Sequence, residues 1–280
     1  MDRIREGDMV TRRSYGEDII FYVTKIEENG VAIAQLVGAN VRLFADSPLT
    51  DLISVNYRQK SGHRSALKQI INAIIVGRSP LSKQLELKGS EPRTDYQVFP
   101  GKVLHIDGEQ HYLTQCLELY KNLKVPVVGL NIREAKQPSE VRTVLEKHRP
   151  DILVITGHDG LVRKQSDRDR LVNYRSSGFF VEAVKQARLY ETDKDGLVII
   201  AGACQSHFEA LIEAGANFAS APNRVMIHCF DPVFIAEKVS FTSFYHVLDM
   251  QQILQTTVSG INGIGGLETR GKMRLGYPIT

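Results

Sequence analysis

The alternation of apolar and amphipathic stretches after residue 100 is the feature that most constrains how this chain can fold. Continuous apolar runs, typical of buried strands, lie at residues 102–106, 125–130, 152–156, 197–201 and 225–230. Stretches with apolar residues at helical spacing lie at residues 112–123, 138–148, 178–190 and 208–214. Strands that are apolar along their whole length are typical of a parallel sheet covered by helices on both faces. The sequence therefore predicts an α/β domain with its functional residues at the carboxyl ends of the strands.

The first 50 residues have a different pattern, in which short β-branched and aromatic runs are separated by tight turns. Residues 18–26 form such a run, and the Glu-Asn-Gly turn at residues 28–30 leads into residues 31–36, which is a hairpin signal. Residues 41–44 supply one more short strand. The pattern predicts a small SH3-like β-barrel at residues 1–50, which is too small to be an enzyme by itself.

Residues 51–95 join these two parts of the chain. An apolar helix is expected at residues 66–76, and residues 88–93 have the glycine, serine and proline content of an exposed linker. The expected organisation is therefore a barrel at residues 1–50, a helical connector at residues 51–95 and an α/β domain at residues 96–280.

Composition and charge argue against several function classes. A net charge of +3 is too small a surplus to favour nucleic-acid binding. The apolar runs are too short to span a bilayer, and the first six residues lack the apolar core of a secretory signal. The three cysteines, Cys116, Cys204 and Cys229, form no CxxC pair, which argues against a zinc site or a disulfide framework. We expect a cytoplasmic protein with no membrane insertion, no nucleic-acid partner, no metal and no cofactor.

Two polar residues stand at matching positions in the expected sheet. The run at residues 152–156 is followed by His158, and the run at residues 197–201 is followed by Cys204, each in a glycine-containing turn. Because neighbouring parallel strands lie about 5 Å apart, loops that leave their ends can bring an imidazole and a thiol together. This placement predicts Cys204 as a nucleophile and His158 as its general acid and base.

The residues around Cys204 favour a reactive thiol. Ser206 and Glu209 match the S-x-x-E capping box, which predicts that a helix begins directly after the cysteine. The positive end of a helix stabilises the thiolate, which is the attacking species. The backbone amides of Cys204, Asp159 and Gly160 are expected to form the oxyanion hole.

A structural role for both residues is the alternative, with Cys204 as a small core residue and His158 as a turn histidine bonded to backbone. For a lone cysteine or histidine this is the commoner case, but their matching strand ends favour a catalytic pair. Cys116, on the apolar face of a helix, and Cys229, in the expected fifth strand, are expected to be buried and inert.

The two strand ends resemble the motifs of caspase-like (clan CD) cysteine peptidases, in which one apolar strand ends in His-Gly and the next in Ala-Cys or Ser-Cys. Here Asp159 is inserted between the histidine and its glycine. The whole chain is also similar to the YabG-type sporulation-specific peptidases of spore-forming Firmicutes. The similar stretches are Gly-Asp-Met-Val at residues 7–10, Arg-Ser-Tyr-Gly at residues 13–16, Ile-Thr-Gly-His-Asp-Gly at residues 155–160, Gly-Ala-Cys-Gln-Ser at residues 202–206 and Ala-Gly-Ala-Asn-Phe-Ala-Ser at residues 214–220.

This resemblance implies a caspase-like fold and a cysteine endopeptidase that cuts after basic residues, chiefly arginine. It implies production in the mother cell, association with the forespore or spore coat, and spore coat and cortex-related proteins as substrates and partners. It also implies self-processing, for which the charge-rich residues 163–175 are the expected loop. Such a charge run is otherwise typical of a solvated loop.

A site that binds arginine needs a carboxylate that can receive the guanidinium group. Asp107 is the first candidate, because the first strand of the expected sheet delivers it to the same edge as His158 and Cys204. A turn or helix-capping role is its alternative. Asp231 is the second candidate, although the proline that follows it is typical of a helix start. Glu109 is the third.

Two other function classes remain open. Residues 202–206 resemble the cysteine elbow of class I glutamine amidotransferases, which are also α/β enzymes. A non-enzymatic spore coat scaffold, with a barrel that binds partners, is the second alternative.

Overall fold

The computed structural model describes residues 4–28, 30–55, 97–162 and 167–276, together with the helical residues 69, 72 and 76. It divides into two compact units, Met1–Asn72 and Ala73–Thr280, and each has its own sheet and its own hydrophobic core. The helix expected at residues 66–76 and the linker expected at residues 88–93 lie almost entirely outside the described residues.

The smaller unit contains a five-stranded antiparallel sheet in the order β4-β3-β2-β1-β5. Its strands are β1 (Met9–Arg12), β2 (Phe21–Glu27), β3 (Ile33–Gly38), β4 (Phe44–Pro48) and β5 (Leu52–Ser54), with the short 3-10 helices η1 (Arg13–Tyr15) and η2 (Leu49–Asp51). Its buried core consists of Val10, Phe21, Val23, Ala34, Leu36 and Leu52.

Two details of this sheet differ from the expected strands. The chain turns between Gly38 and Leu43, whose amide and carbonyl are joined by a 2.8 Å hydrogen bond, so β4 begins only at Phe44, the last residue of the run expected at residues 41–44. Strand β5 pairs with β1 and extends the sheet into the stretch expected to be connector. The turn after Gly38 depends on a local hydrogen bond, and a pattern of apolar residues gives no sign of such a bond.

The larger unit is built on a six-stranded sheet in the order β12-β11-β10-β9-β7-β8. Its strands are β7 (Val103–Asp107), β8 (Val127–Asn131), β9 (Ile152–Thr156), β10 (Val198–Ala201), β11 (Phe218–Ser220) and β12 (Ile264–Gly266). All neighbours are parallel except β12, which runs antiparallel to β11. A separate antiparallel pair joins β6 (Gln97–Phe99) to β13 (Arg274–Gly276). The prediction of an α/β domain on a mainly parallel sheet is confirmed.

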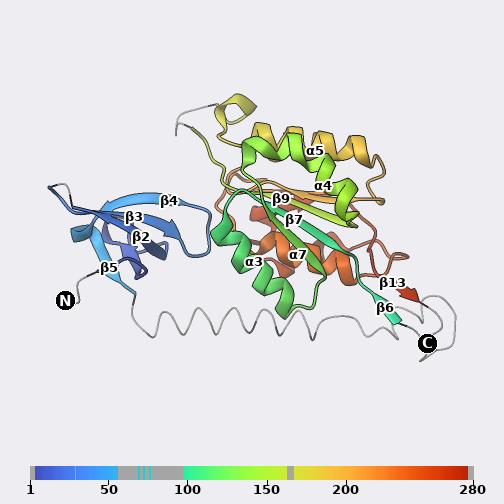
Figure 1. Ribbon diagram of the computed structural model, residues 1–280, viewed down its shortest axis with the longest axis horizontal. Coiled ribbons are helices and arrows are strands. Elements are labelled where there is room, and N and C mark those ends of the chain that lie inside the picture. The colour runs from blue at the N-terminus through green and yellow to red at the C-terminus, as the bar shows by residue number, and fades with distance from the viewer. Residues whose placement is uncertain are drawn as a thin grey trace. The chain divides into compact units, whose positions relative to one another are not determined.

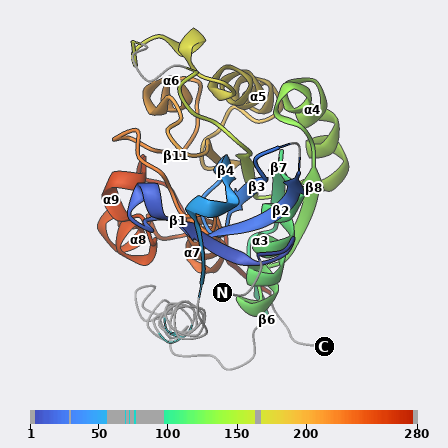
Figure 2. The ribbon, with the colours of Figure 1, turned by 90° about the vertical axis from the view of Figure 1, so that its left-hand side faces the viewer.

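Helices cover both faces of this sheet, with α4 and α5 on one side and α3 and α7 on the other (Figure 1). The helices of this unit are α3 (Gln110–Asn122), α4 (Gln137–His148), α5 (Ser177–Tyr190), α6 (Phe208–Glu213), α7 (Asp231–Phe241), α8 (Met250–Thr256) and α9 (Gly260–Gly263), and its 3-10 helices are η3 (Glu134–Lys136) and η4 (Leu171–Asn173). Figure 2 shows α8 beside α9, and α6 near α5, in agreement with their contacts. Among the described residues, no helix is both long and apolar enough to cross a membrane.

A large hydrophobic cluster fills the space between the sheet and the helices α4, α5 and α6. Alternate strand residues such as Leu153 and Ile155 of β9 point into it, where they meet Val141, Phe180 and Leu211 from the three helices. Full burial of one such side chain stabilises the fold by about 1.5–3 kcal/mol relative to its exposure. This packing holds the strands rigidly, so the loops at their carboxyl ends start from fixed positions.

The fifth strand predicted at residues 225–230 is wrong. The strand that pairs with β10 is β11, and residues 225–230 form an irregular segment and a turn before α7. The apolar residues Met226 and Ile227 pack against Cys204 in place of a strand ladder. Cys229 is buried in this turn, as expected of an inert thiol, although it is not in a strand.

Candidate active site

The two residues singled out in the sequence follow neighbouring parallel strands. His158 lies two residues beyond the end of β9, and Cys204 lies in the loop that follows β10. The strands are in register, with Ala201 opposite Ile155, and the Gly202 amide donates to the Ile155 carbonyl at 3.0 Å. The fold therefore delivers both loops to the same edge of the sheet.

A buried carboxylate, that of Asp159, connects these loops. Its Oδ1 accepts hydrogen bonds from the amides of Gly160 and Ser176, each at 2.8 Å. Its Oδ2 accepts one from the Ser206 hydroxyl at 2.7 Å, and a short one from the hydroxyl of Ser177. The aspartate thus links the histidine loop to the cysteine loop and to the start of α5.

The amides expected to form an oxyanion hole differ in their surroundings. The Gly160 amide is engaged by Asp159 Oδ1, within its own loop. The Gln205 amide, next to the cysteine, donates to the Val225 carbonyl at 3.0 Å. An oxyanion hole made by the amides of Cys204 and Asp159 remains a prediction, and the Gly160 amide would have to leave its present partner to contribute.

The capping box expected after Cys204 is wrong. Helix α6 has six residues and its N-cap is His207. Ser206 donates its hydroxyl to Asp159, and the Glu209 carboxylate binds Arg224. In a capping box the serine oxygen accepts from an amide of the first helical turn. Here it accepts from the Ala203 amide instead, while its O–H donates to the buried Asp159 carboxylate, which is a strong acceptor.

Glu134, at the start of η3, lies at the same edge and was not a candidate in the sequence. Its Oε1 accepts a hydrogen bond from the His158 amide at 2.7 Å. A Cβ atom at Gly108 or Gly157 would overlap the Glu134 carboxylate, so both glycines allow its close approach. These glycines, each just past a strand end, were the one sequence signal that another group approaches there.

The thiol of Cys204 is covered in this structure. Cys204 is 1% exposed, and its Sγ lies 3.6 Å from the Ile227 carbonyl, to which it donates. Ala221, Met226 and Ile227 pack against it. We call residues 221–228 the cover segment, because three of its residues pack against the cysteine.

A polar latch holds the cover segment in place. The Arg224 guanidinium makes a short hydrogen bond to the Glu209 carboxylate of α6 and donates to the Tyr174 hydroxyl at 2.8 Å. Burial opposes ionisation of Glu209, but the hydrogen bond from Arg224 prevails and lowers the pKa of that carboxyl below its ordinary value. Arg224 itself has a left-handed backbone, with φ of 55°, which the latch helps to maintain.

The three acids predicted for an arginine pocket have different surroundings. Asp107 is fully buried at the end of β7, where it accepts a hydrogen bond from the Glu109 amide at 2.9 Å and lies 3.7 Å from His105 Nε2. Asp231 begins α7 and accepts hydrogen bonds from the amides of three loop residues, His228, Val258 and Ser259. Burial raises the pKa of Asp231. Glu109 is the N-cap residue of α3 and is half-buried.

The other two thiols and the histidines His105 and His207 lie in structural settings. Cys116 is fully buried on α3 and donates to the Cys229 carbonyl at 3.4 Å. His105 is fully buried, with its Nδ1 3.2 Å from the Tyr120 hydroxyl. His207 is also buried, with its Nε2 3.1 Å from the Asp169 carbonyl oxygen.

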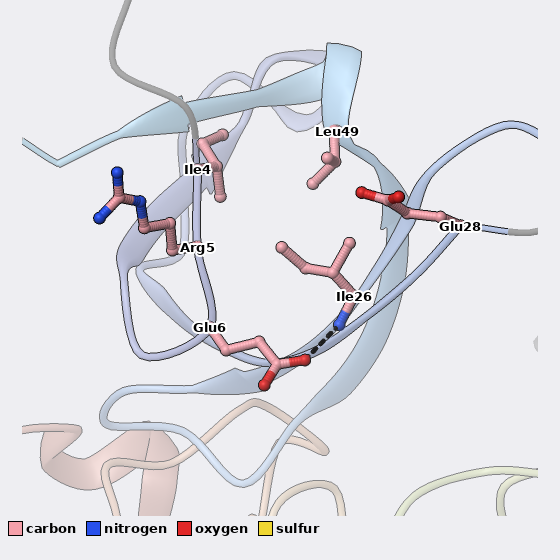
Figure 3. A pocket seen from close by; sticks show the side chains of 6 residues that line it. All are labelled: Ile4, Arg5, Glu6, Ile26, Glu28 and Leu49. Carbon is pink, nitrogen blue, oxygen red and sulfur yellow. Dashed lines mark hydrogen bonds between the residues drawn. The ribbon is translucent and has the colours of Figure 1, made fainter.

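A cavity of about 330 Å³ lies in the smaller unit (Figure 3). It is lined by Ile4, Arg5, Glu6, Ile26, Glu28 and Leu49. Glu6 is tied to the sheet, since its Oε1 accepts a hydrogen bond from the Ile26 amide at 3.0 Å. The lining has apolar and charged side chains but no thiol or imidazole, so it suits binding rather than covalent chemistry.

Comparison with known proteins adds to this geometry. The family described as YabG peptidase U57 matches residues 5–278, which is nearly the whole chain. The chain belongs to this family. It is 43% identical over 281 residues to the "Sporulation-specific protease YabG" of Bacillus subtilis (strain 168), with 97% of each chain covered. No solved structure matches the chain. Membership of this family makes the chain a peptidase.

Proposed function

We propose that this peptidase is a cysteine endopeptidase with Cys204 as its nucleophile and His158 as its general acid and base. The observation that carries the proposal is the placement of the two residues just past the ends of β9 and β10, which are parallel neighbours in register. The Asp159 carboxylate ties the two loops together and so supports a fixed arrangement between them.

The reaction follows from the chemistry of this pair. The Cys204 thiolate attacks the carbonyl carbon of the scissile bond, and backbone amides beside it stabilise the negative oxygen of the tetrahedral intermediate. The carbon–nitrogen bond then breaks as His158 donates a proton to the leaving amine. Water, deprotonated by His158, hydrolyses the thioester and restores the thiol.

The strand order supports a caspase-like version of the α/β fold. The first strand of the sheet, β7, lies between the second and third, β8 and β9, and the order then continues through β10 and β11. In this arrangement the histidine follows the third strand and the cysteine the fourth, as in the peptidases that the motifs resemble. The antiparallel sheet of the smaller unit is compatible with an SH3-like barrel at residues 1–50.

Cleavage after arginine is the second part of the proposal. Asp107 remains the first candidate for the guanidinium-binding carboxylate, because β7 places it at the same edge of the sheet as the catalytic pair. Asp107 is fully buried, so a guanidinium group can reach its carboxylate only after the residues around it have moved. Asp231 is less suited, since three backbone amides already bind its carboxylate, and Glu109 is the weakest of the three.

The name of the bacterial relative supports a role in sporulation. We propose that the protein acts in the mother cell, associates with the forespore or spore coat, and processes spore coat and cortex-related proteins. Self-processing in residues 163–175 is part of this proposal; residues 163–166 lie outside the described residues, and residues 167–170 of the same loop are exposed.

An amidotransferase-like reaction is disfavoured by the placement of its required histidine and glutamate. Such enzymes use a His-x-Glu triplet after the cysteine, and residues 207–209 form one. The His207 Nε2 faces the Asp169 carbonyl, and Glu209 binds Arg224. Both side chains are therefore engaged in holding the structure around the site.

The proposal is tested with short peptides that differ only at the residue before the scissile bond. Incubation of the purified full chain with arginyl, lysyl, citrullinyl and aspartyl peptides should give rapid cleavage of the arginyl peptide and slower cleavage of the lysyl peptide. Citrulline has the shape of arginine without its charge, so its peptide should be resistant. Equal cleavage of the arginyl and citrullinyl peptides would contradict a carboxylate in the pocket, and no cleavage of any peptide would contradict the proposed activity.

A further inference from the structure

The Asp159 carboxylate holds the loop that carries Cys204 on both sides of the cysteine. We propose that Asp159 is a positioning residue, which sets the place of the cysteine through the hydroxyl groups of Ser206 and Ser177. The inference rests on the proposed function, in which Cys204 is the nucleophile.

Each serine hydroxyl connects the Asp159 carboxylate to a backbone amide of the cysteine loop by two hydrogen bonds. The Ser206 hydroxyl donates to Asp159 Oδ2 and accepts from the Ala203 amide at 2.9 Å. The Ser177 hydroxyl donates to the same oxygen and accepts from the His207 amide at 2.9 Å. The loop is thus fixed on both sides of Cys204, one residue before it and three residues after it.

The other carboxylate oxygen holds the histidine side of the site. Asp159 follows His158 directly, and its Oδ1 binds the amides of Gly160 and Ser176. A single buried side chain, 5% exposed, therefore fixes the histidine loop, the start of α5 and the cysteine loop relative to one another. Between the two fixed points, Gln205 has a left-handed backbone with φ of 57°, a conformation that such clamping can hold.

Only a carboxylate can do this. Oδ2 accepts from two hydroxyl groups while Oδ1 accepts from two amides, so all four contacts need an acceptor. An asparagine would present two N–H donors to one of these pairs. Four charge-assisted hydrogen bonds also offset the cost of burying the aspartate. Because an error of about 1 Å in the position of a reacting group can cost about 100-fold in rate, the clamp is suited to hold the thiol in reach of the imidazole.

The test uses three serine variants of the full chain. Ser206→Ala and Ser177→Ala each remove one connection between the Asp159 carboxylate and the cysteine loop, and Ser240→Ala is the matched control. Ser240 lies on a different helix, α7, and is also fully buried, and its hydroxyl donates to the Gly101 carbonyl at 2.7 Å.

All three variants should lower the melting temperature by similar amounts. Ser206→Ala should lower kcat for an arginyl peptide by about 30- to 100-fold with KM nearly unchanged, and Ser177→Ala by a smaller factor. The control should keep kcat within about threefold of the original chain. Equal kcat values for Ser206→Ala, Ser177→Ala and the control would overturn the inference.

A second measurement does not depend on peptide cleavage. The rate of Cys204 alkylation by iodoacetamide is followed against pH in the original chain, in Ser206→Ala and in Asp159→Asn. A thiol held near an imidazolium has a lowered pKa, so loss of the clamp should move the alkylation midpoint upward, toward the value of about 8.5 for a free cysteine. If no peptide is cleaved but the midpoint moves, the proposed function fails while the clamp stands. If peptides are cleaved and neither the midpoint nor kcat changes in Ser206→Ala, the clamp is wrong and the function stands.

Discussion

The five-stranded and six-stranded sheets of this protein differ in what lies at the ends of their strands. In the smaller unit, antiparallel strands follow one another through short connections, and its buried polar residues Thr11, Arg42 and Ser47 lie within these strands or connections. In the larger unit, parallel strands end at one edge of the sheet, where polar residues distant in sequence, such as Asp107, Asp159 and Ser206, are buried. In a parallel sheet, the loops that follow all the strands lie at the same edge. An antiparallel hairpin connects only two neighbouring strands. The proposed chemistry of this peptidase therefore belongs to the larger unit.

The largest effect is expected when the proposed catalytic pair is broken. Cys204→Ala and His158→Ala should each lower kcat/KM for an arginyl peptide by about 1,000-fold or more, because either change removes covalent catalysis. The double variant should be no slower than the single ones, since the two residues act as a unit. Steady-state cleavage assays with the purified chains provide the measurement.

Cys116→Ala is the matched control for this pair, since it removes a fully buried thiol outside the site. It should keep its activity apart from any loss of stability. Substantial cleavage by Cys204→Ala would end the assignment of the nucleophile.

The next effect concerns the arginine pocket. Asp107→Asn keeps the size of the side chain and removes its charge, so it should reduce the preference for arginyl over citrullinyl peptides by about 100-fold while alkylation of Cys204 continues. The ratio of kcat/KM for the two peptides is the quantity to measure. Asp231→Asn is the comparison, and it should leave the ratio unchanged. An unchanged ratio in Asp107→Asn, with a lost ratio in Asp231→Asn, would move the pocket to the start of α7.

The edge of the six-stranded sheet that carries His158 and Cys204 also shows how much of the structure could be predicted from the sequence. The strand at residues 152–156 was predicted with its observed limits, and His158 and Cys204 were placed at its end and at the end of its neighbour. These features follow from local apolar patterns, which record burial directly. A pattern of this kind also failed at residues 225–230, where apolar side chains cover a thiol and form no strand.

What the sequence could not show depends on contacts between distant residues. Glu134 meets the His158 amide from 24 residues away, and Ser206 meets Asp159 from 47 residues away. The S-x-x-E pattern at Ser206 was genuine as a pattern, but a tertiary partner took the serine hydroxyl. Local rules give the alternatives available to a side chain, and the fold decides between them.

A smaller effect is expected from the latch of the cover segment. Glu209→Gln removes the ion pair with Arg224 and should raise the rate of Cys204 alkylation by about three- to tenfold, since partly exposed ion pairs contribute little individually. Glu213→Gln, which changes an exposed glutamate of the same helix, is the control and should have no effect. Slower alkylation in Glu209→Gln would show that the pair does not hold the segment closed.

This latch should also respond to acid. The pKa of Glu209 is lowered in the folded protein, so the latch contributes fully above the ordinary glutamate pKa of about 4.3 and is lost as the pH falls through the lowered value. Alkylation in the original chain, corrected for the thiolate fraction, should therefore rise below about pH 4 toward the rate of Glu209→Gln. Parallel profiles for the two chains at all pH values would contradict the role of Glu209.

The smallest effect is expected when the smaller unit is removed. A chain beginning at residue 95 contains all the proposed catalytic residues, so its kcat/KM for a short arginyl peptide should stay within about threefold of the full chain. Cleavage of a natural protein substrate should fall much further if the smaller unit recruits it, either in the cavity near Leu49 and Ile26 or by addition of a substrate strand to the sheet edge at β4 or β5. Circular dichroism and a cooperative thermal transition must first establish that the shortened chain is folded. Leu49→Asp in the full chain separates the two recruitment routes, because it changes the cavity and leaves the sheet edges in place. If a folded, shortened chain loses peptide and protein cleavage together, the smaller unit is part of the catalytic machinery, and the division of labour between the two sheets is wrong.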